Sequence, residues 1–330
     1  MIEKQISPSA LRARSVLVTG GTGSFGRRFV DFALNQTEAM RVIVFSRDEL
    51  KQHEMQEHYG DHPRLRFFLG DVRELDRLHR AFDGVDIVIH AAALKQIPAA
   101  EYNPFEFVKT NVLGAQNVID AAIDRNVRKV IALSTDKASS PINLYGATKL
   151  VSDRLFVAGN AYSGDKTTRF SVVRYGNVVA SRGSIVWRLK RMPADATFNL
   201  TDPRMTRFWI TLDQAVRFVF ASLDEMRGGE IFIPKLPSMK VTDIVAAVAP
   251  RLQVTTTGIR PGEKLHEEMI STEESRRAVD RGDHYAILPE IAWQDQERLD
   301  GHSLPEGFRY ASDSNDEWLD AATLREQLDD

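Results

Sequence analysis

The stretch SVLVTGGTGSFGRRF at residues 15–29 decides the fold. It combines a short apolar run, a glycine-rich turn and the start of an amphipathic segment. Its glycines match G-x-x-G-x-x-G from Gly20 and G-x-G-x-x-G from Gly21. Such a turn needs glycine because the main chain bends sharply, a phosphate must approach its N–H groups, and Gly26 must let a helix pack closely on the strand. Directly after an apolar strand, the pattern favours a dinucleotide-binding turn over an ordinary turn.

Short apolar runs alternate with amphipathic stretches beyond this turn. The runs, which we expect to be buried strands, lie at residues 15–19, 41–46, 64–70, 85–92, 129–134 and 170–176. Repeated strand–helix–strand units form a parallel sheet with helices on both faces. We therefore predict an α/β fold with a doubly wound parallel sheet of the Rossmann type. The dinucleotide-binding domain should span residues 1–180, with its sheet completed by residues 212–234, and residues 181–330 should mainly form a smaller substrate-binding lobe.

Composition limits the classes of protein to consider. The chain has 330 residues and a net charge of −3, so no overall charge draws it to nucleic acid or to an anionic membrane. It has no cysteine, which excludes disulfides, Cys-ligated metal and a thiol nucleophile. His53 and His58 are five residues apart, whereas two ligands on one helix face need a spacing of four, so we expect no metal site. Without a long apolar run, we expect a cytoplasmic protein with no membrane anchor.

The end of the second strand should contact the ribose in the adenine half of the dinucleotide. This strand ends Phe45-Ser46-Arg47-Asp48, and Lys51 follows closely. Arg47 and Lys51 can pair with a 2′-phosphate, whereas Asp48 could accept a hydrogen bond from a 2′-hydroxyl. The sequence favours NADP over NAD, and the alternative for Arg47 is a solvated surface charge.

Two later strand ends supply further edges of the cofactor site. Asp71 and Val72 follow the third strand and can reach the adenine. Residues 91–93, all alanine, follow the fourth strand and place small side chains beside the cofactor. Alanine runs often serve packing alone, but ligands bind at the carboxyl ends of strands in open α/β sheets. We therefore expect both segments to contact the dinucleotide.

A tyrosine and a lysine lie four residues apart after the fifth strand. Tyr145 and Lys149 share one face of the helix predicted there. A phenol is a poor base at neutral pH because its pKa is about 10, and a neighbouring ammonium helps by stabilising the phenolate. Tyr-x-x-x-Lys alone is common by chance. Together with the glycine turn and the Ser134-Thr135 strand end upstream, the pair predicts a catalytic tyrosine.

Several stretches carry a resemblance to a known family. They are TGGTGSFG (19–26), SRDELKQ (46–52), HAAALKQIPAAEYNP (90–104), STDKA (134–138), NLYGATK (143–149), VVRYGNV (172–178), DPRMTRFWI (202–210) and IRPGEKLHE (259–267). Through them, roughly residues 15–270 resemble the extended short-chain dehydrogenases/reductases that modify nucleotide sugars. The resemblance is strongest to the inverting UDP-N-acetylglucosamine 4,6-dehydratases of the pseudaminic acid pathway.

This resemblance implies a site, residue by residue. Tyr145 with Lys149 would serve hydride transfer, and Asp136 with Lys137 would serve the elimination of water. The implied cofactor, NADP, would be bound by Gly20, Thr22, Gly23, Ser24, Phe25, Gly26, Ser46, Arg47, Lys51, Asp71, Val72, Ala91, Ala92, Ala93, Lys95, Asn111, Tyr145 and Lys149. The implied substrate, UDP-N-acetylglucosamine, would be bound by Lys95, Asn177, Arg182, Arg204, Arg260 and Glu263.

The implied reaction is a net dehydration. Tyr145 would remove the 4-hydroxyl proton while C4 gives hydride to NADP⁺, and the ketone formed would make the C5 proton acidic. A neutral Lys137 would take that proton, a protonated Asp136 would give one to the departing 6-hydroxyl, and hydride would return to C6. Related retaining dehydratases have Asp-Glu at this position, so the Asp-Lys pair favours inversion at C5. The alternative for Lys137 is a protonated lysine paired with Asp136 or with a substrate phosphate.

Two other functions remain open on the sequence alone. An epimerase or reductase of the same fold would need no acid–base pair at residues 136–137. A sensor or scaffold that binds NADP without turnover would give no product. We also expect a homo-oligomer built from dimers, up to a hexamer, with no nucleic-acid partner.

Overall fold

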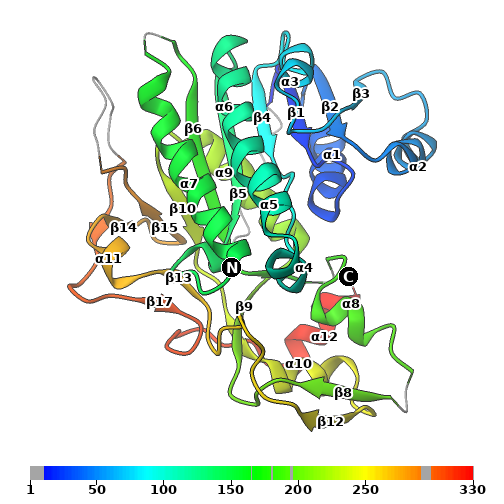
Figure 1. Cartoon of the computed structure of the whole chain (residues 1–330), viewed down its shortest axis with the longest axis vertical. Coiled ribbons are helices and arrows are strands. Elements are labelled where there is room, and N and C mark those ends of the chain that lie inside the picture. Colours follow the sequence, from blue (N-terminus) through cyan, green and yellow to red (C-terminus); the bar gives the residue numbers. More distant parts are fainter. Residues whose placement is uncertain (1–10, 165, 180, 194–195, 291–298, 330) are drawn as a thin grey trace.

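A computed structural model describes residues 11–329 of the chain, except for 165, 180, 194–195 and 291–298. Ala180, the expected end of the first domain, therefore lies outside the described residues. Figure 1 shows a sheet with its helices in the upper part of the view and a smaller group of strands and helices below. The chain is an α/β protein, as the sequence predicts.

The main sheet carries most of the buried core. Its strands are β1 (Ser15–Thr19), β2 (Arg41–Ser46), β3 (Leu65–Leu69), β4 (Ile87–His90), β5 (Lys129–Thr135), β6 (Arg169–Tyr175), β10 (Ile231–Pro234), β14 (Ala278–Asp280), β15 (His284–Ile287) and β16 (His302–Ser303). In the described part of the chain they form one ten-stranded sheet in the order β16-β14-β15-β10-β6-β5-β4-β1-β2-β3. From β3 to β10 neighbouring strands are parallel, so the predicted doubly wound parallel sheet is confirmed. The strand order reverses between β1 and β4, which is where such sheets bind ligands.

Helices connect these strands and cover the sheet. They are α1 (Ser24–Gln36), α2 (Glu49–Tyr59), α3 (Leu75–Ala81), α4 (Ile97–Tyr102), α5 (Pro104–Phe107), the π-helical turn η1 (Val108–Leu113), α6 (Gly114–Asp124), the short 3₁₀ turn η2 (Asp136–Ala138), α7 (Leu144–Tyr162) and α9 (Leu212–Glu225). In Figure 1, α6 and α7 lie in front of the sheet and α9 lies behind it. The rings of Phe29 on α1 and Phe220 on α9 stack with centroids 4.8 Å apart. Burying one such ring contributes about 1.5–3 kcal/mol, so these contacts hold the layers together.

The C-terminal region differs from the sequence expectation in one respect. The sequence assigns residues 181–330 mainly to the smaller lobe, but β14, β15 and β16 join the main sheet. They extend it with antiparallel pairs, and β15 covers the edge of β10. Covering this edge satisfies backbone groups that would otherwise face solvent. Each strand is too short to show a detectable alternation of apolar and polar residues, so the sequence pattern could not reveal them.

The smaller lobe has a core of its own. The remaining elements are β7 (Asn177–Val178), α8 (Ile185–Leu189), β8 (Thr197–Leu200), β9 (Thr206–Ile210), β11 (Ser238–Lys240), α10 (Val241–Val248), β12 (Gln253–Thr256), β13 (Glu268–Ile270), α11 (Thr272–Ser275), β17 (Tyr310–Ala311) and α12 (Ala321–Asp329). Of these, β13 and β17 contribute Met269, Ile270 and Tyr310 to the main core. Val186, Trp209, Ile244 and Leu324 pack together in this second core. Among the helices that the structure describes, none has both the length and the apolar character needed to cross a bilayer.

Candidate active site

A cavity of about 1160 Å³ opens along the carboxyl ends of β1, β2, β4 and β5. Its wall also includes residues 175–178 and 181–184, which lead from β6 into the smaller lobe. With the exception of Asn111, every residue that the sequence assigns to the cofactor lines this cavity. The structure therefore brings both strand ends and lobe residues to one site at the edge of the sheet where α/β proteins bind ligands.

The glycine turn forms one end of the cavity. Gly20 has a φ of +66°, and a Cβ atom there would lie 2.9 Å from the main chain of Ala92. Only glycine fits this conformation and this close approach. The turn leads directly into α1, whose first residues, Ser24 and Phe25, line the cavity. The free N–H groups at the start of this helix can bind the diphosphate of a dinucleotide.

The expected ribose-binding cations lie at the same end, and each faces a carboxylate. Arg47 Nη1 is 3.5 Å from Asp71 Oδ2, and the Arg47 side chain is 54% exposed. Lys51 forms an ion pair with Asp48, the residue that caps α2. Arginine and lysine can pair with a 2′-phosphate, while the aspartates can accept from a hydroxyl. The cavity thus has groups for either form of the ribose, and the preference for NADP stays a prediction.

The loop after β4 crosses the floor of the cavity. Lys95 on this loop lines the cavity. Burial lowers the pKa of its ammonium, and the nearby Lys137 lowers it further. Asn111, expected to bind the cofactor, lies instead behind this loop in the turn η1. Its side chain donates to the Leu94 carbonyl and accepts from the Leu94 N–H, both at 2.9 Å, and it also donates to Thr148. These hydrogen bonds hold the loop that carries Lys95 in place.

Tyr145 and Lys149 face the cavity from the first turns of α7. Asn143 caps this helix by accepting from the Gly146 N–H. A Cβ atom on Gly146 would lie 2.2 Å from the Lys137 carbonyl oxygen, so glycine lets the helix start directly against η2. This packing brings the Tyr145 hydroxyl beside the Asp136-Lys137 pair.

Tyr145 has Lys137 as a nearby cation in addition to Lys149 on its own helix. Burial raises the pKa of Tyr145 to about 12, and Lys137 is a neighbouring cation that lowers it. The expected effect of Lys149 on the phenol stays a prediction. Burial also lowers the pKa of Lys149, although the nearby Asp153 partly opposes this.

Asp136 and Lys137 form η2 at the end of β5. Lys137 Nζ lies 3.0 Å from Asp136 Oδ1, and the Asp136 side chain is 1% exposed. Burial and the neighbouring Glu267 raise the pKa of Asp136, against the pull of Lys137. Burial alone would lower the pKa of Lys137, but the two carboxylates outweigh it and raise it. The raised pKa means that Lys137 carries its proton in the resting cluster, and its role as the C5 base stays a prediction.

Glu267 is the site residue that sequence reasoning missed. Its Oε1 lies 3.2 Å from Lys137 Nζ and 3.7 Å from Arg207 Nε, and its side chain is 2% exposed. Burial opposes its ionisation, but Lys137, Arg207 and Lys264 together hold its pKa below the ordinary value. The residue ends the quoted stretch IRPGEKLHE, which was the signal available in the sequence. Within the described residues, no three His, Cys, Asp or Glu side chains group as metal ligands would.

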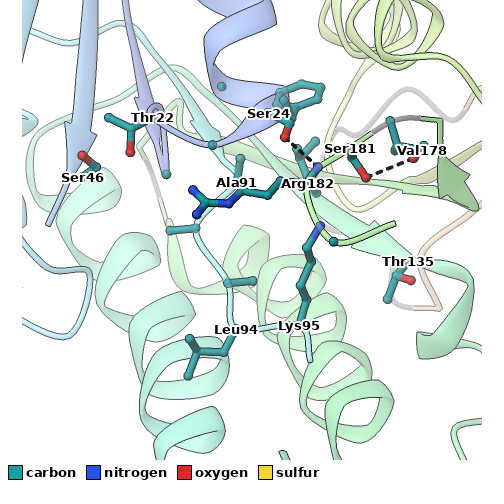
Figure 2. Close-up of a pocket in the computed structure, with 18 of the residues that line it drawn as sticks. Thr22, Ser24, Ser46, Ala91, Leu94, Lys95, Thr135, Val178, Ser181 and Arg182 are labelled. Atoms are coloured by element: carbon teal, nitrogen blue, oxygen red, sulfur yellow. Dashed lines mark hydrogen bonds between the residues drawn. The ribbon is translucent and has the colours of Figure 1, made fainter. Parts of the chain in front are cut away.

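The lobe residues expected to bind substrate are only partly at the cavity. Asn177 and Arg182 line it together with Lys95, and the Asn177 Oδ1 atom is buried without a hydrogen-bond partner in the described structure. Figure 2 shows the Arg182 side chain extending past Ser24 toward Thr22 and Ser46. The main-chain N–H of Arg182 donates to Ser24 Oγ at 3.2 Å, which holds this segment against the start of α1.

Three further residues expected to bind substrate lie outside the cavity wall. Arg204 forms an ion pair at 2.7 Å with Asp202, two positions before it, and its side chain is largely exposed. Arg260 is exposed, and Glu263 is half-buried with its Oε2 atom buried and unpartnered among the described residues. None of the three is among the described residues that line the cavity. Their role in binding therefore stays a prediction.

Comparison with known proteins places the chain in a family. The family described as "Polysaccharide biosynthesis protein" matches residues 16–289. The UDP-N-acetylglucosamine 4,6-dehydratase (inverting) of Campylobacter jejuni strain 81-176 is 51% identical over 96% of this chain and 96% of its own length. The UDP-glucose 4-epimerase of Rickettsia felis is 40% identical over 83% of this chain and 82% of its own length.

A solved structure extends this likeness to the whole fold. The X-ray structure of Pen from Bacillus thuringiensis superposes with a TM-score of 0.88 at 34% identity, covering 96% of this chain and 97% of that one. The match includes the smaller lobe as well as the sheet, because it spans nearly all of both chains. The chain therefore belongs to the polysaccharide biosynthesis protein family, within the extended short-chain dehydrogenases/reductases.

Proposed function

We propose that this protein is a UDP-N-acetylglucosamine 4,6-dehydratase that inverts C5, a hydro-lyase. The observation that carries the proposal is the joint placement of Tyr145, Asp136 and Lys137 at one cavity that also contains a dinucleotide-binding glycine turn. The likeness to the inverting dehydratase of C. jejuni supports it over nearly the full chain. The product would be UDP-2-acetamido-2,6-dideoxy-β-L-arabino-hex-4-ulose, and a place in pseudaminic acid biosynthesis is the corresponding pathway proposal.

A nicotinamide dinucleotide fits the cavity as cofactor. The start of α1 can bind its diphosphate, and Gly20, whose main chain packs closely on that of Ala92, lies in the turn that leads into this helix. Arg47 and Lys51 can pair with a 2′-phosphate, which is why we propose NADP over NAD. When bound, this group accepts hydride from the sugar and returns it within the same turnover.

Tyr145 acts first in the proposed scheme. Its hydroxyl takes the proton of the sugar 4-hydroxyl as C4 is oxidised to a ketone. Because burial raises the pKa of Tyr145 to about 12, its phenolate must be stabilised within the site, and Lys137 is a protein cation that does so. Lys149 lies one turn along the same helix face and lines the cavity, where it can bind and orient the cofactor.

Asp136 and Lys137 carry the elimination. The 4-ketone makes the C5 proton acidic, so a base can remove it. Lys137 takes this proton, the C5–H electrons form the C5–C6 double bond, and the C6–O bond breaks as Asp136 gives its proton to the leaving hydroxyl. The raised pKa of Asp136 suits it to hold that proton until it is needed. Asn177, Arg182 and Lys95 can bind the substrate at the lobe side of the cavity.

Association of subunits belongs to the same proposal. Tyr102, Phe105 and Leu113 are exposed apolar side chains on α4, α5 and η1. Clustered exposed apolar side chains mark protein–protein contacts. We propose a homo-oligomer built from dimers through this surface, and we keep the cytoplasmic location as a prediction from the sequence.

An epimerase of the same fold is the second candidate, and the match to the Rickettsia felis UDP-glucose 4-epimerase favours it. Incubation with UDP-N-acetylglucosamine in deuterated water separates the two. The dehydratase gives a product lighter by one water, with deuterium at C5 and the inverted configuration by proton NMR. The epimerase gives a product of unchanged skeleton with C4 inverted, and a protein that only binds the cofactor gives no product. The variant Tyr145→Phe is the control, because it should bind the cofactor and form no product.

A further inference from the structure

Glu267 adds a second carboxylate to the Asp136-Lys137 pair. Lys137 Nζ contacts Asp136 Oδ1 at 3.0 Å and Glu267 Oε1 at 3.2 Å, so one ammonium is shared by two buried carboxyl groups. Asp136 Oδ2 and Glu267 Oε2 are both buried without a hydrogen-bond partner in the described structure. Buried carboxylate oxygens without donors are costly, so a cluster of this kind needs a reason beyond stability.

The charges around the cluster assign its protons. Two carboxylates that share a buried site compete for the negative charge. Glu267 faces Lys137 on η2, Arg207 on β9 and Lys264 before β13, whereas Lys137 is the cation in contact with Asp136 among the described residues. We therefore assign the negative charge to Glu267 and the proton to Asp136.

With the protons placed in this way, Lys137 is an ammonium and cannot act as the base for the C5 proton. Its amine can take the C5 proton only as its ammonium loses one. Asp136 cannot accept that proton, because it already holds the proton destined for the 6-hydroxyl. The other acceptor in contact with Nζ in the described structure is Glu267 Oε1.

Glu267 is also held firmly in place. Its N–H donates to Ser312 Oγ at 2.9 Å, and its carbonyl accepts from the Ser312 N–H at 2.8 Å. Its neighbour Arg207 is fixed by hydrogen bonds to the carbonyls of residues 206, 264 and 265. The main chain of Glu267 is therefore fixed, and a fixed arginine borders its carboxylate, which favours a constant distance to Lys137.

We propose that Glu267 is a positioning residue for the elimination: it holds Lys137 against Asp136 and accepts the ammonium proton. In the resting cluster the raised pKa of Lys137 and the lowered pKa of Glu267 oppose this transfer, so it accompanies removal of the C5 proton. The N–H bond of Lys137 breaks, an O–H bond forms at Glu267 Oε1, and the amine takes the C5 proton in the same step. The net charge of the cluster is the same before and after this transfer, so no charge is created in the buried site. This inference rests on the proposed dehydratase function and names a residue that the function requires.

The test compares two variants in adjacent positions. Glu267→Gln keeps the size of the side chain but removes the carboxylate that accepts the proton. Glu268→Gln is the control, because it changes the next carboxylate along the chain, which accepts hydrogen bonds from Ser139 and Ser140. Two readouts are measured with UDP-N-acetylglucosamine and NADP⁺ in deuterated water: the appearance of reduced nicotinamide, which reports C4 oxidation, and the incorporation of deuterium at C5.

We expect Glu267→Gln to lower C5 exchange and water loss at least about 100-fold, while C4 oxidation changes by less than about threefold. Retained C4 oxidation also shows that the variant is folded. Glu267→Asp, which restores a carboxylate, should recover at least about a tenth of the lost activity. Glu268→Gln should keep both readouts within about threefold of the parent protein.

Other results contradict the proposal in distinct ways. Normal C5 exchange in Glu267→Gln would mean that Lys137 discharges its proton elsewhere. Equal loss of both readouts in Glu267→Gln and Glu268→Gln, without rescue by Glu267→Asp, would reduce Glu267 to a structural contact. Absence of any dehydrated product with the unaltered protein would overturn the proposed function itself, and this inference with it.

Discussion

Two buried clusters in this protein each place one cation between two carboxylates. In the lysine cluster (Asp136, Lys137 and Glu267), Asp136 and Lys137 line the cavity and Glu267 contacts Lys137. The arginine cluster (Asp153, Arg174 and Glu274) lies within the fold, and its Arg174 side chain is 0% exposed. Arg174 donates to both oxygens of Glu274, at 2.9 and 3.0 Å, and to the Met269 carbonyl at 2.8 Å.

The difference lies in what each cation can do. Arginine binds a carboxylate through two parallel bonds and does not lose its proton in proteins. Lysine is a point charge whose proton can leave when its surroundings change. We therefore expect the arginine cluster to be a fixed structural brace and the lysine cluster to allow proton transfer. Exchanging the two cation types tests this distinction.

The largest effect should come from Lys137→Arg. The variant keeps a positive charge beside Asp136 and Glu267, so its unfolding free energy should change by less than about 1 kcal/mol. Because a guanidinium cannot become the base, water loss should fall roughly 10²–10⁴-fold. Product formation from UDP-N-acetylglucosamine and urea unfolding measure the two quantities. A variant that still dehydrates the sugar at more than a tenth of the normal rate would contradict the role of Lys137.

Arg174→Lys is the reciprocal exchange. Lysine cannot bond both oxygens of Glu274 and the Met269 carbonyl in the same geometry, so buried acceptors lose their donors. We expect the unfolding free energy to drop by about 2–3 kcal/mol, with turnover per folded molecule within a few-fold of normal. Denaturant titration and activity at low temperature measure both. Unchanged stability would mean that the arginine cluster is not a brace.

The sequence predicts some residues of the site and not others. The glycine turn and the pair at residues 136–137 were predictable because each directly follows a strand, and Tyr145 and Lys149 were predictable because they share one face of the next helix, α7. Parallel strands bring such ends together, so their meeting follows from topology alone. Glu267 reaches Lys137 only through packing of the lobe against η2, and nothing local in the sequence reports that contact.

Some of the expected ligand contacts show a different limit. Arg204 lies outside the cavity wall, where it pairs with Asp202, two residues earlier. A sequence motif identifies such an arginine but not the partner that it has when no ligand is bound. Asn111 shows the same limit, since the sequence does not reveal the hydrogen bonds that its side chain makes with Leu94, and its role in cofactor binding stays a prediction.

The pH dependence of the arginine cluster should be smaller and has a definite sign. Burial opposes ionisation of Glu274, but Arg174 and the hydrogen bonds that Glu274 accepts hold its pKa below the ordinary value. A depressed carboxyl pKa contributes stability above the unfolded value of about 4.3, and this contribution is lost as pH falls through the folded value. The raised pKa of Asp153 acts in the opposite direction, so the comparison must isolate Glu274.

Glu274→Gln isolates it. The difference in unfolding free energy between the parent protein and this variant should be largest near pH 7 and shrink as pH falls below about 4. Urea titrations of both proteins across this range give the difference. A gap that stays constant with pH would show that Glu274 contributes through its shape and not through its charge.

The smallest effect should come from an arginine–aspartate pair whose arginine is exposed. Arg47 and Asp71 are 3.5 Å apart, and Arg47 is more than half exposed, so Arg47→Ala should change stability by less than about 0.5 kcal/mol. If Arg47 binds the 2′-phosphate, NADP affinity should fall about tenfold while NAD affinity stays the same. Calorimetric titration with both dinucleotides measures this. Equal losses would mean that Arg47 does not distinguish them.

The partners in the arginine cluster lie far apart in the sequence, and this separation affects when the protein can fold during synthesis. Arg174 lies in β6, but its partner Glu274 follows 100 residues later, and the Ser139–Glu268 contact spans 129 residues. A ribosome that has released the chain only as far as β6 presents an arginine that has Asp153 as a partner but not yet Glu274. Contacts this distant in sequence are slow to close. The packing around Arg174 is therefore completed only late in synthesis, at about the stage when Glu267 becomes able to reach Lys137.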